Sequence, residues 1–493
     1  MSIALALTAT FIGASAHAEG LSADQAVARA ARDNPSLRAT EYDVRAAQEG
    51  VRAEKHDRDP TLTTNASGQY AETLNVGGDT ASRRASAGIG VDSSLTYTTD
   101  YGTSLEWGVS SDLTWASTTS TELFGPVYAT NTYFTLRQPL LRGAGRDLIL
   151  APLRQAELGQ TSATKDRELA TSQTVLAVLQ AYWELWYARR ATTVEEAALE
   201  LAKRQLADAK AKVEVLGTGA NVDVLQFASS VAAINESLAS TRANEKTRAI
   251  ELGRLLGLAP DKSLELTATD SEPSLGTLPS AATLVEALVE RSPELAAMRA
   301  DLETLESRVA VATNARKPRV DLFSTVSMGA AWTDDDLPGL QLPGNAPAFA
   351  VLGGVTFELP LGGGRAPADL ARAQAQLDAA RARYQARVDA ITSDVAKLGV
   401  ALDTASEQAK LAGETADLSE KLAQAQRERF SIGVISSADV VKAEQDAREA
   451  ELRRLRAIVD RASTTFALEN AAGTLLARFS EVLAQGAGSG AGS

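Results

Sequence analysis

Apolar and polar residues follow two different periods in different parts of the chain. In long, Ala-rich stretches the apolar positions recur at helical spacing, as in Val175, Val178, Leu179 and Tyr182. In other stretches they alternate with small or polar residues, as in residues 349–359. The chain is therefore expected to combine long helices with separate blocks of strands.

The helical stripes are narrow and rich in alanine, so one helix alone cannot bury enough apolar surface. We expect these helices to pack side by side, as in a coiled coil or a wall of helices. Trp183, Trp186 and Tyr187 lie on one face of such a helix. Ordinary packing is the favoured interpretation of this aromatic set, ahead of a role in stacking on a ligand.

The alternating segments run over about ten residues and carry aromatic side chains near their ends, which is typical of the strands of a membrane β-barrel. A soluble β-sandwich shows the same alternation, so this pattern alone does not decide between the two. The alternating positions are Ile89, Val91, Leu95, Tyr97, Leu105, Trp107, Val109, Phe349, Val351, Val355, Phe357 and Leu359.

An internal repeat relates the two halves of the chain. Asn34-Pro35 corresponds to Ser292-Pro293, and Pro318 follows Pro60 by the same 258 residues. Each segment is expected to be a helix of about 35 residues that ends before its proline.

Further landmarks extend the repeat. Gly143 to Arg146 corresponds to Gly362 to Arg365, and Gly433 follows Gly217 by 216 residues. The helix between these landmarks would be roughly 100 Å long in each copy. The first strand block is the longer one, which predicts an additional hairpin turning at Thr98–Gly102. Whether this hairpin joins a barrel wall is left open by the sequence.

The predicted organisation follows from these landmarks. A signal peptide (1–18) comes first. The first repeat comprises a helix (19–60), strands and loops (61–142), and a long helix with tip turn and return helix (143–258). After a linker (259–280), the second repeat comprises a helix (281–318), strands (319–361), and a long helix with tip turn and return helix (362–480), and a flexible tail follows (481–493).

The composition excludes several classes of protein. The chain has no cysteine and only two histidines, His17 and His56, which removes thiol chemistry and leaves little for His-based catalysis or transition-metal binding. The net charge of −14 argues against nucleic acid as a partner. Asp334–Asp336 lacks the glycine and glutamate of a calcium loop, so a solvated loop is favoured. We expect no cofactor and no bound metal.

The order of helix, strands, long helix, turn and return helix, given twice, resembles the TolC-like outer-membrane efflux protein family. The resemblance rests on the two proline starts, on Gln138-Pro139-Leu140 and Leu359-Pro360-Leu361 before their Gly-Arg motifs, and on the turns Gly217–Leu225 and Gly433–Val441. It implies an α+β membrane protein in which a homotrimer shares one transmembrane β-barrel, with a long antiparallel α-helical barrel in the periplasm.

The resemblance also implies partners and site residues. The two turns, at Gly217-Thr218 and Gly433-Val434, would meet a periplasmic adaptor of an inner-membrane pump. A gate is predicted at Asp439, with Asp223. Ser436 and Asp439 also have the spacing of a capping box at the start of the return helix, and the two roles are compatible. Lys442 stands where family members commonly carry a second acid, and could partly neutralise an acidic ring or pair with a neighbouring protomer.

Three functions compete at this point. The leading hypothesis is a passive outer-membrane duct in a Gram-negative bacterium that exports drugs, metals or secreted proteins, since the chain has no nucleotide-binding glycine loop of its own. A periplasmic coiled-coil scaffold anchored at the outer membrane is the alternative. An enzyme is disfavoured because the many acids on the helices are more simply a solvated face.

Overall fold

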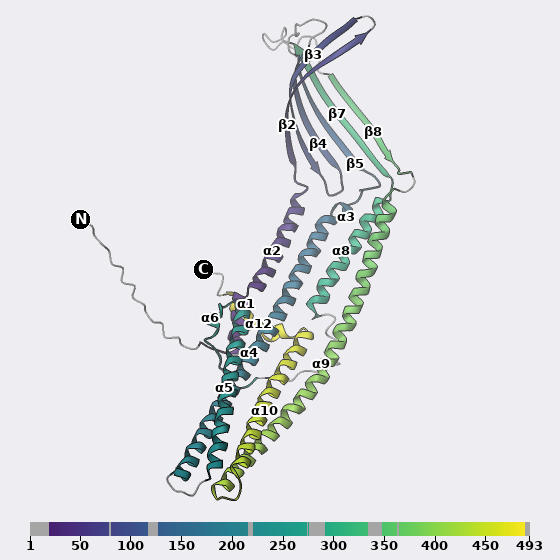
Figure 1. Cartoon of the computed structure of the whole chain (residues 1–493). Coiled ribbons are helices and arrows are strands. Elements are labelled where there is room, and N and C mark those ends of the chain that lie inside the picture. Colours follow the sequence, from purple (N-terminus) through teal and green to yellow (C-terminus); the bar gives the residue numbers. More distant parts are fainter. Residues whose placement is uncertain are drawn as a thin grey trace, which may run out of the picture. The chain divides into compact units, whose positions relative to one another are not determined.

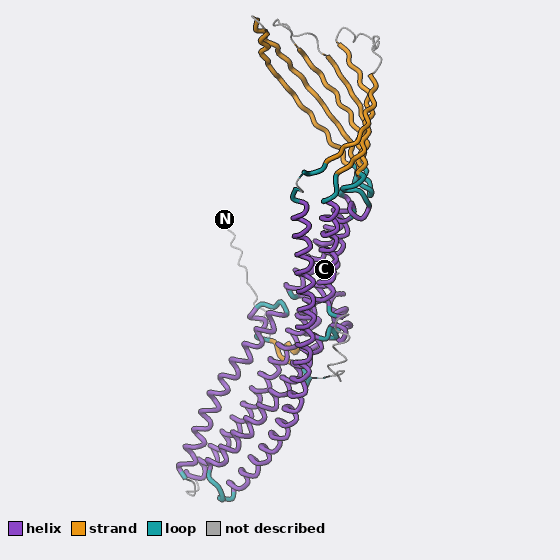
Figure 2. Tube along the Cα trace, turned by 90° about the vertical axis from the view of Figure 1, so that its right-hand side faces the viewer, coloured by secondary structure: helices purple, strands orange, loops and turns teal. Residues whose placement is uncertain are grey.

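The computed structural model describes residues 19–77, 80–116, 127–214, 220–273, 275, 291–333, 348–361 and 364–488. It separates into two compact units (Figures 1 and 2). The first, mainly helical, contains residues 1–43, 164–297 and 385–493, and the second, which holds the large sheet, contains residues 44–163 and 298–384. The predicted signal peptide lies outside the described residues.

Two long helical hairpins dominate the first unit. One is formed by α4 (Ala151–Glu214) and α5 (Asn221–Leu255), and the other by α9 (Ala366–Ser431) and α10 (Ser437–Ala471), with α4 and α9 beginning in the second unit. No described helix has both the length and the apolarity needed to cross a lipid bilayer.

The core of this unit gathers around the aromatic residues of α4. Tyr182 and Trp186 are fully buried, and a short parallel pair of strands, β1 (Glu19–Leu21) and β6 (Leu266–Ala268), lies against them. The Tyr182 hydroxyl donates to Asp270 Oδ2 at 2.9 Å, and Trp186 Nε1 donates to the Asp270 carbonyl at 2.8 Å. Burial raises the pKa of the Tyr182 phenol. Of the aromatic set noted in the sequence, Trp183 and Trp186 are buried in this core and Tyr187 packs against it, which confirms ordinary packing.

The segments expected to be linker and tail carry structure of their own. The described part of residues 259–280 includes β6 and α6 (Pro260–Ser263), which contact α5, while Asp270 is hydrogen-bonded to Tyr182 and Trp186 of α4. Beyond α11 (Leu475–Arg478), α12 (Ser480–Gly488) places Val482 and Leu483 against the core. The expectation of a flexible tail from residue 481 therefore differs from the structure up to Gly488, because those two apolar side chains are packed.

The helix expected to run up to Pro60 is interrupted. It forms α1 (Ala23–Asp33) and α2 (Pro35–His56), with Asn34 in an extended conformation between them. Pro35 disfavours the helical conformation at the residue before it. The Asn34 side chain then accepts from Ser36 N at 2.8 Å and donates to the Leu255 carbonyl at 2.8 Å, which fixes the break.

The second unit contains one continuous antiparallel sheet of six described strands. In spatial order they are β2 (Thr61–Gly77), β3 (Thr80–Thr98), β4 (Ser104–Ala116), β5 (Val127–Pro139), β7 (Arg319–Thr333) and β8 (Ala348–Glu358). Figure 2 shows them side by side in a single layer. The short α3 (Arg146–Ile149) follows β5, and α8 (Pro293–Ala315) precedes β7.

The additional hairpin predicted in the first block is present. β3 turns into β4 at Thr99–Thr103, where Gly102 has φ +82° and its N–H donates to the Thr99 carbonyl. β3 and β4 are hydrogen-bonded to each other and to β2 and β5. The first block thus contributes four strands and the second two, and the hairpin that the sequence could not place belongs to the sheet.

The two faces of the sheet differ in polarity. Cross-strand pairs such as Leu95 with Trp107, Trp107 with Phe134, and Val326 with Val351 put apolar side chains on one face, although that face is exposed. Its large exposed members are Leu62, Tyr70, Ile89, Val91, Leu95, Tyr97, Trp107, Phe134, Leu322, Val326, Met328, Phe349, Val351, Val355 and Phe357.

The other face is mainly polar. It carries Asp92, Glu106 and Asp112 on the additional hairpin. Near the helix-bearing ends of the strands, Asp321 is 2% exposed and accepts from Arg319 Nε at 2.7 Å and Arg137 Nε at 2.9 Å. A sheet with one apolar and one polar face, both accessible in a single chain, needs two different surroundings.

Candidate functional site at the helix tips

The turn between α9 and α10 is built around Gly433. Its φ of +77° is in the left-handed region, which glycine adopts without a steric penalty. Gly433 N donates to the Phe430 carbonyl at 2.9 Å and Val434 N to the Arg429 carbonyl at 3.0 Å. This pair of bonds is the Schellman motif, which satisfies the last carbonyls of α9. Val434 next to it is 59% exposed.

The corresponding turn of the first hairpin is only partly described. Gly217 and Thr218 lie outside the described residues, so their predicted contact with an adaptor stays a prediction. The chain is described again from Ala220, which precedes the first residue of α5. Asp223 lies in the first turn of α5, where its carboxylate favours the helix dipole.

Asp439 completes a capping box at the start of α10. Ser436 Oγ accepts from Asp439 N at 3.3 Å, and Asp439 Oδ2 accepts from Ser436 N at 3.1 Å and from Ser436 Oγ at 2.7 Å. The hydrogen bonds from Ser436 lower the pKa of the Asp439 carboxyl, so it stays ionised at pH values at which an ordinary aspartate begins to take up a proton. The capping role is therefore confirmed, while the gate stays a prediction.

Lys442 pairs within its own helix. Its Nζ lies 3.5 Å from Asp446 Oδ1, four residues along α10, and both side chains are largely exposed. An exposed pair of this kind is weak and is easily exchanged for another partner. Partial neutralisation of Asp439 by Lys442 stays a prediction.

The tips of the two hairpins pack against each other. Phe430, near the end of α9, stacks edge-on against Phe227 of α5 at 5.7 Å, and Lys212 Nζ of α4 lies 5.5 Å from the centre of the Phe430 ring. A cavity of about 320 Å³ beside them is lined by residues of all four helices, among them Asp223 and Val440. Of the predicted gate residues, Asp223 lines this cavity, while the second hairpin contributes Val440, the residue after Asp439.

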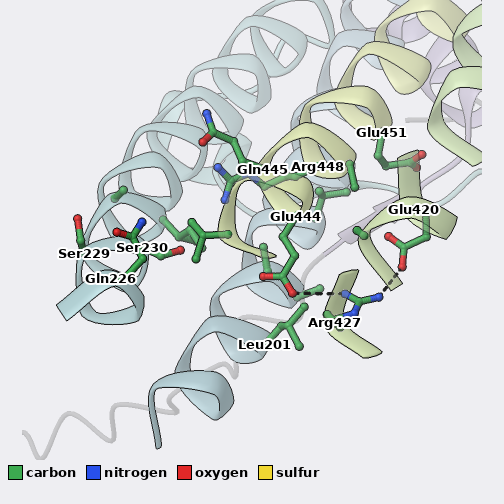
Figure 3. A pocket seen from close by; sticks show the side chains of 18 residues that line it. Leu201, Gln226, Ser229, Ser230, Glu420, Arg427, Glu444, Gln445, Arg448 and Glu451 are labelled. Carbon is green, nitrogen blue, oxygen red and sulfur yellow. Dashed lines mark hydrogen bonds and ion pairs between the residues drawn. The ribbon is translucent and has the colours of Figure 1, made fainter. Parts of the chain in front are cut away.

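A second cavity, of about 480 Å³, separates the hairpins farther from the turns (Figure 3). Glu444 of α10 accepts from Gln205 Nε2 of α4 at 2.6 Å and lies 3.6 Å from Arg427 of α9, which also pairs with Glu420. Desolvation raises the pKa of the Glu444 carboxyl, and Gln205 and Arg427 only partly oppose this effect.

Another polar contact joins the hairpins through a buried acid. Glu195 of α4 is 2% exposed, accepts from Ser237 Oγ of α5 at 2.9 Å and lies 3.7 Å from Arg448 of α10. Sequence reasoning missed Glu195, Arg448 and the Gln205–Glu444 contact. A signal existed for Glu195, since it occupies the same helical stripe as the buried Ala191, Leu199 and Ala202.

The described residues include no group of three or more His, Cys, Asp or Glu side chains placed to hold a metal ion. Asp334–Asp336, the acidic run noted in the sequence, lies outside the described residues. In the described part of the helix tips, the interactions are hydrogen bonds, ion pairs and packing between helices.

Solved structures of outer-membrane channels share this fold. The outer-membrane channel OprN superimposes with a TM-score of 0.67 at 20% identity, covering 92% of this chain and 90% of OprN. The CmeC outer membrane channel of Campylobacter jejuni gives 0.69 at 15% identity, covering 94% and 89%. The outer membrane protein VceC of Vibrio cholerae gives 0.64 at 18% identity, covering 93% and 95%.

The sequence itself gives a family match over part of the chain. Residues 284–474 match the profile of the outer membrane efflux protein family. A search of curated proteins gives no significant sequence match. The profile match and the shared fold together confirm the resemblance to the TolC-like outer-membrane efflux protein family that the repeated motifs indicated.

Proposed function

We propose that this chain is a non-enzymatic, passive export duct in the outer membrane of a Gram-negative bacterium. Three copies share one transmembrane β-barrel, and their long helices line a tunnel in the periplasm. A pump in the inner membrane, reached through a periplasmic adaptor, supplies the driving force and the substrates, which are drugs, metals or secreted proteins.

The observation that carries this proposal is the polarity of the six-stranded sheet. Its exposed apolar face includes Trp107 at 54% and Phe357 at 64% exposed, and such a surface is unfavourable in water. Its opposite face carries carboxylates and hydroxyls. A barrel with lipid outside and water inside gives each face the surroundings that suit it.

The adaptor contact is supported by apolar side chains near the turns. Val222 and Leu225, at the start of α5, are 70% and 69% exposed, while Ile432 and Val434, in the second turn, are 75% and 59% exposed. Apolar residues on the end of a helical hairpin suit the apolar part of a docking surface.

Substitutions at the turns test this contact. Thr218→Trp and Val434→Trp add bulk where the adaptor is expected to dock, and should reduce adaptor crosslinking and export several-fold while trimers persist. Leu264→Trp, an exposed change in a short loop away from the turns, is the control and should leave both unchanged. Crosslinking and export that survive both turn substitutions would contradict the adaptor site.

The duct itself is tested by cell fractionation followed by gel electrophoresis with and without heating. A shared barrel should appear in the outer-membrane fraction as a trimer that dissociates only on boiling. A chain extracted by salt without detergent, with the mobility of a monomer under both conditions, would favour the scaffold instead.

A further inference from the structure

The two halves of the chain contribute different numbers of strands to the sheet, and these numbers determine how many strands each copy can add to a barrel. β2 to β5 come from the first block, whereas only β7 and β8 come from the second. The hairpin β3–β4 is not an appendage above the sheet. Thirteen residue pairs join β3 to β4 without a break, from Ser86–Ala116 to Thr98–Ser104.

The outward surface of these additional strands is suited to lipid. Four hydroxyl groups on the apolar face are paired with each other there: Thr64 Oγ1 lies 3.1 Å from Ser93 Oγ, and Ser111 Oγ lies 3.3 Å from Thr130 Oγ1. Trp107 Nε1 donates to Thr132 Oγ1 at 3.2 Å. The apolar face therefore continues across β2, β3, β4 and β5.

The sheet has two edges, β2 and β8, and they run in opposite directions. Neighbouring strands are antiparallel throughout, so an even number of strands leaves the first and last antiparallel to each other. Each edge strand has a strand neighbour on one side only among the described residues. Exposed edges of this length need a partner strand, above all in a bilayer.

A barrel closed by pairing β2 with β8 of the same chain would be too narrow. Six strands spaced by about 4.8 Å and tilted as in a barrel would close at a diameter of roughly 12 Å. Even eight strands enclose only enough space for side chains. The polar face, which would line the inside, carries bulky side chains, with Tyr133 lying over Gly108 and Phe323 over Gly354. A barrel of six strands would have no room for them.

We propose that β8 of one copy pairs antiparallel with β2 of the next, so that each copy contributes all six strands to the wall. This inference rests on the proposed trimer. Three copies then give eighteen strands and a backbone diameter of roughly 35 Å, the size class of barrels that leave an aqueous channel. The additional hairpin thereby widens the pore and places Asp92, Glu106 and Asp112 on its lumenal side.

The absence of cysteine from the chain allows a direct test by disulfide crosslinking. Thr356→Cys on the polar face of β8 is combined, one at a time, with Thr61→Cys, Thr63→Cys, Asn65→Cys and Ser67→Cys on the polar face of β2. In oxidised outer-membrane vesicles, at least one combination should give covalently linked dimers and trimers.

The matched control combines Thr356→Cys with Glu106→Cys or Ser110→Cys on β4, two strands inside the proposed wall. These pairs should remain monomeric on a denaturing gel. Crosslinks between copies through β4 but not β2 would place β2 and β3 outside the wall and overturn the inference. A β2–β8 crosslink within one chain, or none at β2 although trimers form, would also overturn it.

The same experiment separates this inference from the proposed function. If no trimer is found in the outer membrane before oxidation, the duct itself fails. If trimers are present, the crosslinking pattern decides between six strands per copy and fewer. Averaged end-on electron micrographs of the purified trimer give an independent readout, since the ring should measure roughly 35 Å across its backbone.

Discussion

The helical unit and the sheet unit use aromatic residues in opposite ways. Trp186 of α4 is 2% exposed and has its indole nitrogen satisfied within the chain, whereas Trp107 of β4 is 54% exposed on the apolar face. In the helical unit the chain supplies its own apolar core, while the sheet presents apolar side chains to the outside. The proposed duct would account for this difference, since it places the sheet in lipid and the helices in water.

Placing a charge on the exposed apolar face of the sheet should have the largest effect. Val326, at the middle of β7, pairs with Phe134 and Val351 on the apolar face. Val326→Arg would place a charge near the bilayer centre at a cost of about 2–4 kcal/mol per chain. We expect heat-resistant trimers to disappear from the outer membrane.

Ser327→Arg is the matched control, because the neighbouring residue points to the polar face opposite Tyr133 and Ala350. Trimers should assemble with this substitution. Equal yields of the two variants on gels of outer-membrane fractions would mean that the apolar face does not meet lipid.

The next largest effect is the difference in stability loss between alanine substitutions of Trp186 and Trp107. Trp186→Ala removes a fully buried side chain and should destabilise the helical unit by about 3–5 kcal/mol. Trp107→Ala on the sheet should alter the stability of the same helices by less than about 1 kcal/mol. Urea unfolding followed by helical circular dichroism measures both; similar losses would remove the distinction between the two surfaces.

Within the helical unit, Glu444 should make stability depend on pH. Burial raises the pKa of its carboxyl above the ordinary value of 4.5, so the folded state holds this proton more tightly than the unfolded state does. The contribution of Glu444 to the stability of the helical unit should therefore be greatest below about pH 4.5. It should be lost as the pH rises through the raised pKa.

Glu444→Gln should abolish that part of the pH dependence, measured as the urea midpoint of the helical signal between pH 4.5 and 7. Arg427 and Gln205 face this group and remain in place. Glu428→Gln, which alters an exposed acid of α9, should leave the profile unchanged. A profile identical for all three proteins would show that Glu444 is not desolvated.

The smallest expected effect concerns the gate at Asp439. Asp439→Asn removes a charge from the start of α10 while an amide oxygen can still accept from Ser436, so stability should change by less than about 1 kcal/mol. In bilayer recordings we expect lower cation selectivity or weaker block by multivalent cations.

Glu449→Gln removes one negative charge ten residues along α10, away from the cap and from the Lys442–Asp446 pair, and should affect selectivity less. The opposite result for Asp439→Asn, a loss of thermal stability with selectivity and block intact, would leave this residue as a cap alone and place the gate elsewhere.

Much of the fold could be predicted because the sequence carries it in simple periods. The alternation of Phe349, Val351, Val355 and Phe357 predicted strand β8, and Gly433 with Ser436 and Asp439 predicted the second turn and its cap. The break at Asn34 was missed because the pattern of apolar positions continues across it, while the interruption depends on a hydrogen bond to Leu255, far away in the sequence.

The candidate site was less accessible to sequence reasoning. Charged residues on helices are usually solvated, and only the packing of two hairpins distinguishes Glu195 and Glu444 from their exposed neighbours. Likewise, block length predicted a hairpin at Thr98–Gly102, but only the continuous pairing of β3 with β4 and β2 assigns it to the sheet.

Conductance of the purified protein in a planar lipid bilayer tests whether the chain forms a channel. Detergent-purified trimers should give discrete, uniform conductance steps, and Val326→Arg protein prepared in the same way should give none. Wild-type protein that binds the bilayer but never conducts, including after substitution of the predicted gate residue Asp439, would contradict the channel and leave a membrane-anchored scaffold.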